Sequence, residues 1–177
     1  MAVVKKNQTK IHRWVAYYLL SKIVRKLQPN KYVMAGSYRR GKWWLNDLDL
    51  LIEVASDSEA EGYVHRIQQF GWLPVEGRGR YNLTTFSKQF YKDLSGHIVI
   101  LDLFLIEPGA WGNALLFTTG SKYFNNRLRS KAISLGYSWN NPRYFERLVD
   151  GVQISFDTEH KALAFLGERW IRPRVRL

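Results

Sequence analysis

The stretch Gly36-Ser37-Tyr38-Arg39-Arg40-Gly41, followed by Asp47-Leu48-Asp49, predicts both the fold and the site of this chain. Residues 48–54 are apolar apart from Asp49 and Glu53, as expected of a buried strand. Side chains alternate along a strand, so Asp47 and Asp49 point the same way. Two adjacent carboxylates repel each other unless a cation lies between them. Magnesium prefers oxygen ligands of this kind, which predicts a metal site.

An anion site is predicted just upstream. A short helix that begins at Gly36, after a strand at 31–36, would direct free backbone N–H groups at an anion. Taken alone, a Gly-Ser turn is usually only a turn, and an Asp-x-Asp at a strand edge is more often a cap or a solvated pair. A third aspartate, Asp102, lies inside the apolar run 97–106. If that strand lies beside 48–54 the three aspartates converge; the alternative for Asp102 is a salt bridge to a buried arginine. The combination indicates a nucleotide-binding centre.

The charge balance favours a polyanionic partner. The chain has 177 residues, with 27 Lys and Arg against 15 Asp and Glu and a net charge of +12. No acidic residue precedes Asp47, and the carboxyl end is also basic. Basic surfaces with aromatic neighbours are typical of proteins that bind polyphosphates. A ribosome-adjacent or merely soluble basic protein is the alternative.

Composition also excludes several classes of protein. The chain has no cysteine, which excludes disulfides, thiolate zinc sites and cysteine nucleophiles. No run of 18 apolar residues and no signal peptide occur, so we expect an intracellular protein without a membrane partner. The length predicts one domain, or one domain with a small appendage.

Hydrophobic periodicity predicts the elements. A helix at 9–28, capped by Thr9, would bury one face, and a helix at 121–136 would bury another. The predicted inward residues are Ile11, Trp14, Val15, Tyr18, Leu19, Ile23 and Leu27 in the first helix and Tyr123, Phe124, Leu128, Ala132 and Ile133 in the second. The other predicted elements are a helix from Ser56 to Gly71, a hairpin of 72–76 with 80–86 across Gly77-Arg78-Gly79, a helix at 108–117, a small sheet at 144–156 and a helix at 159–166. A boundary near 106 divides the chain into subdomains 1–106 and 107–177.

These motifs together resemble family X DNA polymerases. The matching residues, in the family's order, are Gly36 to Gly41, Asp47-Leu48-Asp49, Leu101-Asp102-Leu103, Phe117-Thr118-Thr119-Gly120-Ser121, Phe124-Asn125, Arg129, Thr158-Glu159, Leu166-Gly167 and Trp170-Ile171-Arg172-Pro173. The resemblance implies an α+β fold: a polymerase beta-like nucleotidyltransferase palm, with a mixed β-sheet flanked by helices, and a small C-terminal α/β subdomain. It is similar to the minimal viral members, which implies a virus- or phage-encoded protein without the lyase domain.

The resemblance also implies roles for particular residues. Asp47, Asp49 and Asp102 would be catalytic and would bind two Mg²⁺ ions, with Mn²⁺ as a substitute. The implied partners are dNTP and gapped or primer–template DNA, bound by a monomer that fills short gaps in DNA repair. The implied nucleotide-binding residues are Gly36, Ser37, Arg40, Phe117, Thr118, Gly120 and Asn125. The implied DNA-binding residues are Lys122, Arg127 and Arg129.

Departures from the family pattern leave alternatives open. The family usually has Tyr-Phe where this chain has Phe117-Thr118, and Ile100 and Phe104 stand where some relatives place arginines. Thr118 would either leave room for a ribose 2′-hydroxyl or bond to it, or else Phe117 and its carbonyl hold the gate alone. Another nucleotidyltransferase with the same palm, which adds nucleotides to an end or to RNA, is the main alternative. A catalytically dead nucleic-acid-binding protein is a third reading, which the intact aspartates disfavour.

Overall fold

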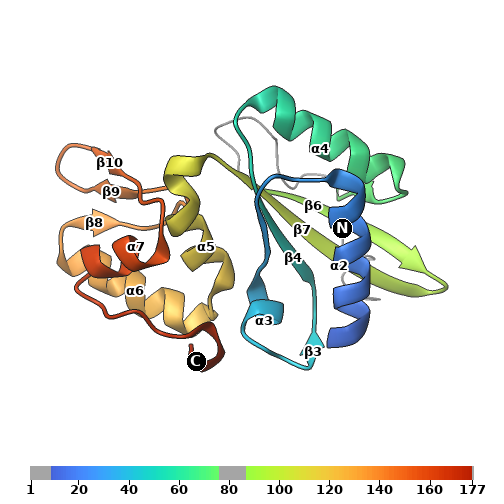
Figure 1. Cartoon of the computed structure of the whole chain (residues 1–177). Coiled ribbons are helices and arrows are strands. Elements are labelled where there is room, and N and C mark those ends of the chain that lie inside the picture. Colours follow the sequence, from blue (N-terminus) through green and yellow to red (C-terminus); the bar gives the residue numbers. More distant parts are fainter. Residues whose placement is uncertain (1–8, 76–86, 177) are drawn as a thin grey trace.

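A five-stranded mixed sheet is the centre of the N-terminal part of the molecule (Figure 1). The computed structural model describes residues 9–75 and 87–176. Strand β4 runs parallel to β7, and every other pairing in this sheet is antiparallel. The strand order is β2 (Tyr32–Met34), β4 (Leu48–Glu53), β7 (His97–Ile106), β6 (Ser87–Leu94) and β5 (Leu73–Pro74). A mixed sheet combined with helices fits the predicted α+β class.

The alternation along β4 and β7 places the acidic residues on one face of the sheet. Leu48, Leu50 and Ile52 belong to the core beneath the helices, together with the alternate residues of β7. Asp49 is therefore on the opposite face, and it pairs directly with Asp102 in the parallel register. The predicted side-by-side placement of the two strands is confirmed.

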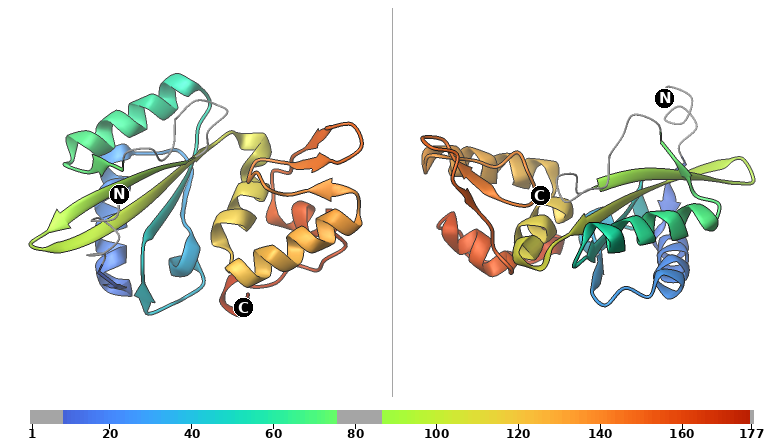
Figure 2. Two further views of the ribbon diagram at one scale, coloured as in Figure 1. Left: turned by 180° about the vertical axis from the view of Figure 1, so that it is seen from behind. Right: turned by 90° about the horizontal axis from the view of Figure 1, so that it is seen from above.

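Helices α2 (Arg13–Leu27) and α4 (Asp57–Gln69) cover the face of the sheet that carries Leu48, Leu50 and Ile52, as the view from above in Figure 2 shows. The predicted buried face of the first helix is wrong in part. The helix buries Ala16, Leu20, Ile23 and Leu27, whereas Trp14, Val15 and Tyr18 are exposed. The reason lies at its start. Strand β1 (Ile11–His12) pairs with β3 (Trp44–Leu45), so the helix begins at Arg13 and Thr9 does not cap it.

The elements around the Gly-Ser motif and α4 agree with the predictions from sequence. Strand β2 ends at Met34, and a short helix α3 (Gly36–Arg39) follows as predicted. Ser56 caps α4 by accepting a hydrogen bond from the Glu59 amide, and Gly71 follows the helix with a φ of +74°.

The described residues contain a hairpin that differs from the predicted one. Residues 76–86, which include its turn and second strand, lie outside the described residues. Strand β5 pairs with β6, and β6 forms a hairpin with β7. The joining residues Ser95 and Gly96 both have positive φ, which is the geometry of tight hairpin turns. Ser95-Gly96 is a weaker turn signal than a Gly-Gly or Asn-Gly pair, which is why this hairpin was not predicted.

The C-terminal part follows β7 and has its own core. Helices α5 (Trp111–Thr119), α6 (Lys122–Ser134) and α7 (Glu159–Phe165) pack with a three-stranded antiparallel sheet. That sheet comprises β8 (Tyr137–Ser138), β9 (Phe145–Arg147) and β10 (Gln153–Ile154), and the 3-10 turns are η1 (Pro108–Ala110) and η2 (Pro173–Val175). Of the predicted inward residues of α6, Tyr123 and Ile133 are exposed, because the helix turns Phe124, Leu128 and Ala132 to the core.

The two parts meet where α5 lies against β4. Leu51 and Ile106 pack there with Trp111, Ala114 and Leu115. The predicted boundary near residue 106 stays a prediction. No helix in the described residues is long and apolar enough to cross a lipid bilayer.

Candidate functional site

A cavity of about 700 Å³ lies between the two parts. Its volume falls within the range of small-molecule sites. Every predicted nucleotide-binding residue lines it, as do Asp47, Asp49 and Lys122. The lining residues are Gly36, Ser37, Arg40, Lys42, Trp44, Asn46, Asp47, Asp49, Phe117, Thr118, Gly120, Lys122 and Asn125. Segments far apart in sequence thus form one site.

The acidic side of the cavity is built on β4. The Asp49 carboxylate lies against Gly36, whose position leaves no room for a side chain: a Cβ there would be 1.7 Å from Asp49 Oδ2. Burial, and then the charges of Asp47 and Asp102, raise the pKa of Asp49 well above its usual value, although Arg40 acts in the opposite direction. Burial also raises the pKa of Asp47. The three carboxylates therefore form one electrostatic cluster.

The chemistry of this cluster suits a hard divalent cation. All three donors are carboxylate oxygens, and a cation among them would relieve the repulsion that raises the Asp49 pKa. Among the residues that the structure describes, no group of three or more acidic, His or Cys side chains is already spaced to hold a metal ion. The donors therefore fit a magnesium ion in type, although their spacing in this structure is not that of a formed metal site.

Asp102 is oriented by a residue that was not predicted from the sequence. Gln89 on β6 stands opposite Asp102 in the sheet, and its side-chain amide donates to Asp102 Oδ1 at 2.8 Å. A neutral amide is thus one partner of Asp102. This hydrogen bond fixes the Asp102 carboxylate from the side away from β4.

Helix α3 supplies the polar groups of the opposite wall. The Ser37 hydroxyl is buried and has no hydrogen-bond partner among the described residues. The Arg40 guanidinium donates to the Thr119 carbonyl, at the end of α5. Burial lowers the pKa of Arg40, while Asp49 and Asp47 raise it. An unpaired hydroxyl beside a cation in a cavity is suited to a phosphate oxygen.

The junction of α5 and α6 forms the third wall. Gly120 has a φ of +62°, the Gly120–Ser121 peptide is cis, and Ser121 caps α6. Asn125 reaches back across this junction and donates to the Phe117 carbonyl at 2.7 Å, so both residues face the cavity. Asn125 Oδ1 is buried without a partner among the described residues, which leaves one acceptor for a ligand.

Thr118 does not present a free donor to the cavity. Its hydroxyl donates to the Ala114 carbonyl one helical turn earlier, at 2.7 Å. This geometry favours the alternative in which Thr118 only packs and the Phe117 position acts as the gate. The Phe117 and Trp139 rings form a T-shaped contact with centroids 5.5 Å apart, and this contact limits the movement of the Phe117 side chain.

The three predicted DNA-binding residues are in different settings. Lys122 is exposed and lines the cavity. Arg127 is exposed and pairs with Glu168 at 3.0 Å. Arg129 is partly buried: it lies over the Phe117 ring and donates to the Trp139 carbonyl at 3.1 Å. Arg129 thus supports the third wall of the cavity.

A buried ion network ties α3 to the C-terminal part. Arg39 donates to both oxygens of Glu159, at 2.8 and 2.7 Å, and to the Thr119 hydroxyl at 2.7 Å. Arg176 donates to the same Glu159 carboxylate at 2.8 Å. Glu159 and Arg176 are buried. Because Arg39 and Arg40 are adjacent, the network holds the cavity walls together.

Three lining residues, Lys42, Trp44 and Asn46, were not predicted from the sequence. They lie between the Gly-Ser motif and Asp47, so their position between two predicted ligand groups was the available signal. No such signal exists for Gln89, because the pairing of β6 with β7 had not been predicted.

The comparisons with known proteins bear on the C-terminal part. Residues 114–177 match the family model described as DNA polymerase beta thumb. The match supports a polymerase beta-like family X relationship and suggests DNA binding. It includes α6 and α7 and most of α5, and it leaves residues 1–113 outside. No curated protein matches the chain.

Proposed function

We propose that this protein is a template-directed DNA polymerase of the family X type, which adds dNTPs to a primer 3′-hydroxyl and fills short gaps in DNA as a monomer. The observation that carries the proposal is the cavity, which joins Asp47, Asp49 and the unpaired Ser37 hydroxyl to Phe117 and Asn125 of the thumb-like segment.

The nucleotide would lie across the cavity from α3 to the junction of α5 and α6. The Ser37 hydroxyl and the Arg40 cation support binding of the triphosphate at one end. Asn125 Oδ1, held by the hydrogen bond of its amide to the Phe117 carbonyl, supports contact with the base or sugar at the other. Lys122 would contact the DNA beside the nucleotide.

Asp47, Asp49 and Asp102 would hold two magnesium ions, or manganese in their place. When bound, such ions activate the primer hydroxyl and stabilise the charge on the leaving pyrophosphate. Asp102 would accept the proton of the primer hydroxyl, and Gln89 would keep its carboxylate oriented toward that hydroxyl. The rest of the protein's contribution is positioning and charge neutralisation, as is usual in phosphoryl transfer.

Primer extension on a gapped duplex tests this proposal. We expect templated dNTP addition that requires Mg²⁺ and is lost in Asp49→Asn. Asp157→Asn is a matched control, because Asp157 is exposed and pairs with Lys161, four residues later on the same surface, at 2.8 Å. Retained turnover in Asp49→Asn would contradict the proposal.

The substrate arms of the same assay separate the alternatives. Addition that is independent of the template, or faster with rNTPs than with dNTPs, would indicate the other nucleotidyltransferase activity. Binding of DNA with no addition to any end would indicate a nucleic-acid-binding protein.

A further inference from the structure

The N-terminal part carries an unusual set of exposed or half-exposed aromatic side chains, which we call the aromatic face: His12, Trp14, Tyr17, Tyr18, Trp43 and Trp44. Trp14 is 67% exposed, and Trp43 and Trp44 are each 61% exposed. Tyr17 and Tyr18 are half-exposed on the outer side of α2. Concentrated exposure of large rings on one surface marks an interaction site.

The rings at one end of this face are held in place by the backbone. Strand β1 pairs with β3, and the Arg13 amide donates to the Trp43 carbonyl at 2.8 Å. His12 stacks on Trp43, with ring centroids 6.0 Å apart and planes 22° apart, and meets Trp44 edge-on at 5.1 Å. The rings are thus presented in fixed positions with much of their surface in solvent.

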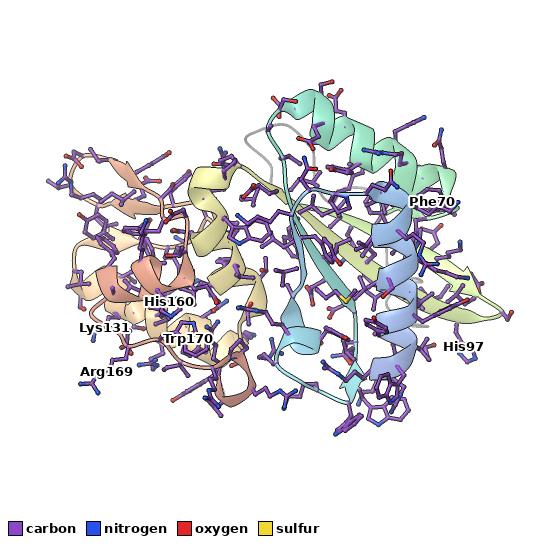
Figure 3. The ribbon with its side chains drawn as sticks, viewed as in Figure 1. Phe70, His97, Lys131, His160, Arg169 and Trp170 are labelled. Carbon is purple, nitrogen blue, oxygen red and sulfur yellow. The ribbon has the colours of Figure 1, made fainter. Side chains whose placement is uncertain are left out.

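The segment that carries the aromatic face contributes only basic charges. Residues 9–46, which carry the whole face, contain no aspartate or glutamate. Lys22, Arg25 and Lys26 are exposed along α2, and the Lys22 ammonium lies 4.4 Å from the Tyr18 ring centroid. With Tyr18 and Phe70, these cations line an apolar hollow of about 580 Å³ beside α2; Figure 3 labels Phe70 there. These features fit a partner that is a polyanion with flat apolar groups.

The aromatic face shares Trp44 with the proposed active site. Trp44 and Lys42 line the nucleotide cavity, and Trp43 lies between them in sequence. A chain that leaves the cavity at this edge would meet Trp43 and then the outer side of α2.

We propose that the aromatic face binds single-stranded nucleic acid, with unpaired bases stacked on Trp43 and Trp14 and phosphates neutralised by Lys22, Arg25 and Lys26. Base–aromatic stacking beside basic residues is the general mode of single-strand binding. A duplex cannot use these rings, because its base faces are already stacked on each other. The inference depends on the proposed function only in assuming that the bound single strand is also the substrate of the proposed active site.

Titration of a fluorescently labelled oligothymidylate by anisotropy, without nucleotide or metal, tests the inference. We expect Trp43→Leu and Trp14→Leu each to weaken binding by at least about fivefold, the lower limit for loss of one stacked base. Trp43→Phe keeps a ring and should restore most of the affinity. Trp170→Leu is the matched control: Trp170 is 40% exposed and stacks on His160 in the C-terminal part, far from α2 in Figure 3.

The salt dependence provides an independent measurement. Loss of Lys22 and Arg25 together, as glutamines, should reduce the log–log slope for the single strand by about 1.4, at about 0.7 per phosphate contact. Thermal melting of each variant shows whether it is folded. Equal weakening in Trp170→Leu, unchanged affinity in folded Trp43→Leu and Trp14→Leu, or equal loss on blunt duplex would each overturn the inference.

These results do not depend on turnover. If primer extension fails but the tryptophan variants lose single-strand affinity as expected, the proposed function is wrong and the binding face stands. If extension succeeds and the variants bind the single strand normally, the proposed function stands and the inference about the aromatic face is wrong.

Discussion

Replacement of Glu159 by glutamine should destabilise the protein far more than the loss of a carboxylate from an exposed ion pair. The Glu159 side chain is 5% exposed and accepts three charge-assisted hydrogen bonds, two from Arg39 and one from Arg176, whose own side chain is 0% exposed. Glutamine removes the negative charge and leaves two guanidinium groups without it. Loss of one partner from a buried ion pair costs about 3–5 kcal/mol.

This magnitude translates into a large shift in melting temperature. For a chain of this size, 1 kcal/mol corresponds to about 2–4 °C, so we expect Glu159→Gln to melt about 6–20 °C lower at neutral pH. Calorimetry or circular dichroism measures the shift. Glu168→Gln is the control, because Glu168 pairs with the largely exposed Arg127 and Lys131 and should cost about 0–1 kcal/mol.

The pH dependence gives a second signature. Burial raises the pKa of Glu159, but the hydrogen bonds from Arg39 and Arg176 outweigh it, and the net pKa is lowered from 4.5. The stabilisation is therefore present above pH 4.5 and is lost as the pH falls through the folded-state pKa. The gap between wild type and Glu159→Gln should narrow in acid. A loss below about 1 kcal/mol at neutral pH, equal to that of the control, would refute the reasoning.

Three further predictions concern the cavity. Asp49→Asn should raise the melting temperature at neutral pH without metal. Burial raises the pKa of Asp49 in the folded protein, so wild-type stability falls as the pH rises from the unfolded-state pKa of this residue toward its folded-state pKa. A lower melting temperature of Asp49→Asn would contradict this prediction. Gly36→Ala should lose at least about 1–2 kcal/mol of stability, since Gly36 has a φ of +52° and lies against Asp49, whereas Gly62→Ala in α4, with only a side-chain atom at 3.9 Å, should be neutral or stabilising in the same denaturant titration. Thr118→Val should change discrimination between dNTP and rNTP by less than about twofold in competitive insertion, because the Thr118 hydroxyl already donates to a backbone carbonyl; a change of about tenfold would show that this hydroxyl reads the sugar.

The site was predictable from sequence where it depends on local periodicity. The two-residue spacing of Asp47 and Asp49 predicted two neighbouring carboxylates; Asp47 lies in the bend just before β4, Asp49 lies on the strand, and both line the cavity. The apolar, β-branched residues around Asp102 likewise predict a strand. The parallel register of that strand with β4 places Asp102 beside Asp49. The glycine at position 36 marked a turn that no residue with a side chain could make beside Asp49.

The buried face of α2 could not be predicted in the same way. Large aromatic residues at helical spacing predict a buried face, and this pattern wrongly places Trp14 and Tyr18 in the core. The actual contact row begins at Ala16, because the pairing of Ile11 with Leu45 sets where the helix starts and how it is turned. That pairing joins distant segments, and periodicity within one helix does not encode it.

Side-chain partners far apart in sequence were also invisible. Arg39 and Glu159 are 120 residues apart, and Gln89 and Asp102 are joined by a hairpin whose turn is Ser95-Gly96. Each residue alone is an ordinary polar residue. Their roles arise only when the sheet and the thumb-like segment are brought together.

If the cavity binds a nucleotide as proposed, the adjacency of Arg39 and Arg40 would link binding of that ligand to the contact between the two parts. Arg39 is held by Glu159, whereas Arg40 donates a hydrogen bond to the Thr119 carbonyl at the end of α5. A phosphate that attracted Arg40 would weaken the hydrogen bond between Arg40 and the Thr119 carbonyl. A movement of α5 that broke this hydrogen bond would in turn free the Arg40 guanidinium to bind the phosphate. By reciprocity, both effects have the same coupling free energy. If the cavity binds a phosphate as proposed, Arg40 at the end of α3 would contact the anion, while Arg39 beside it holds α3 to Glu159 of the C-terminal part.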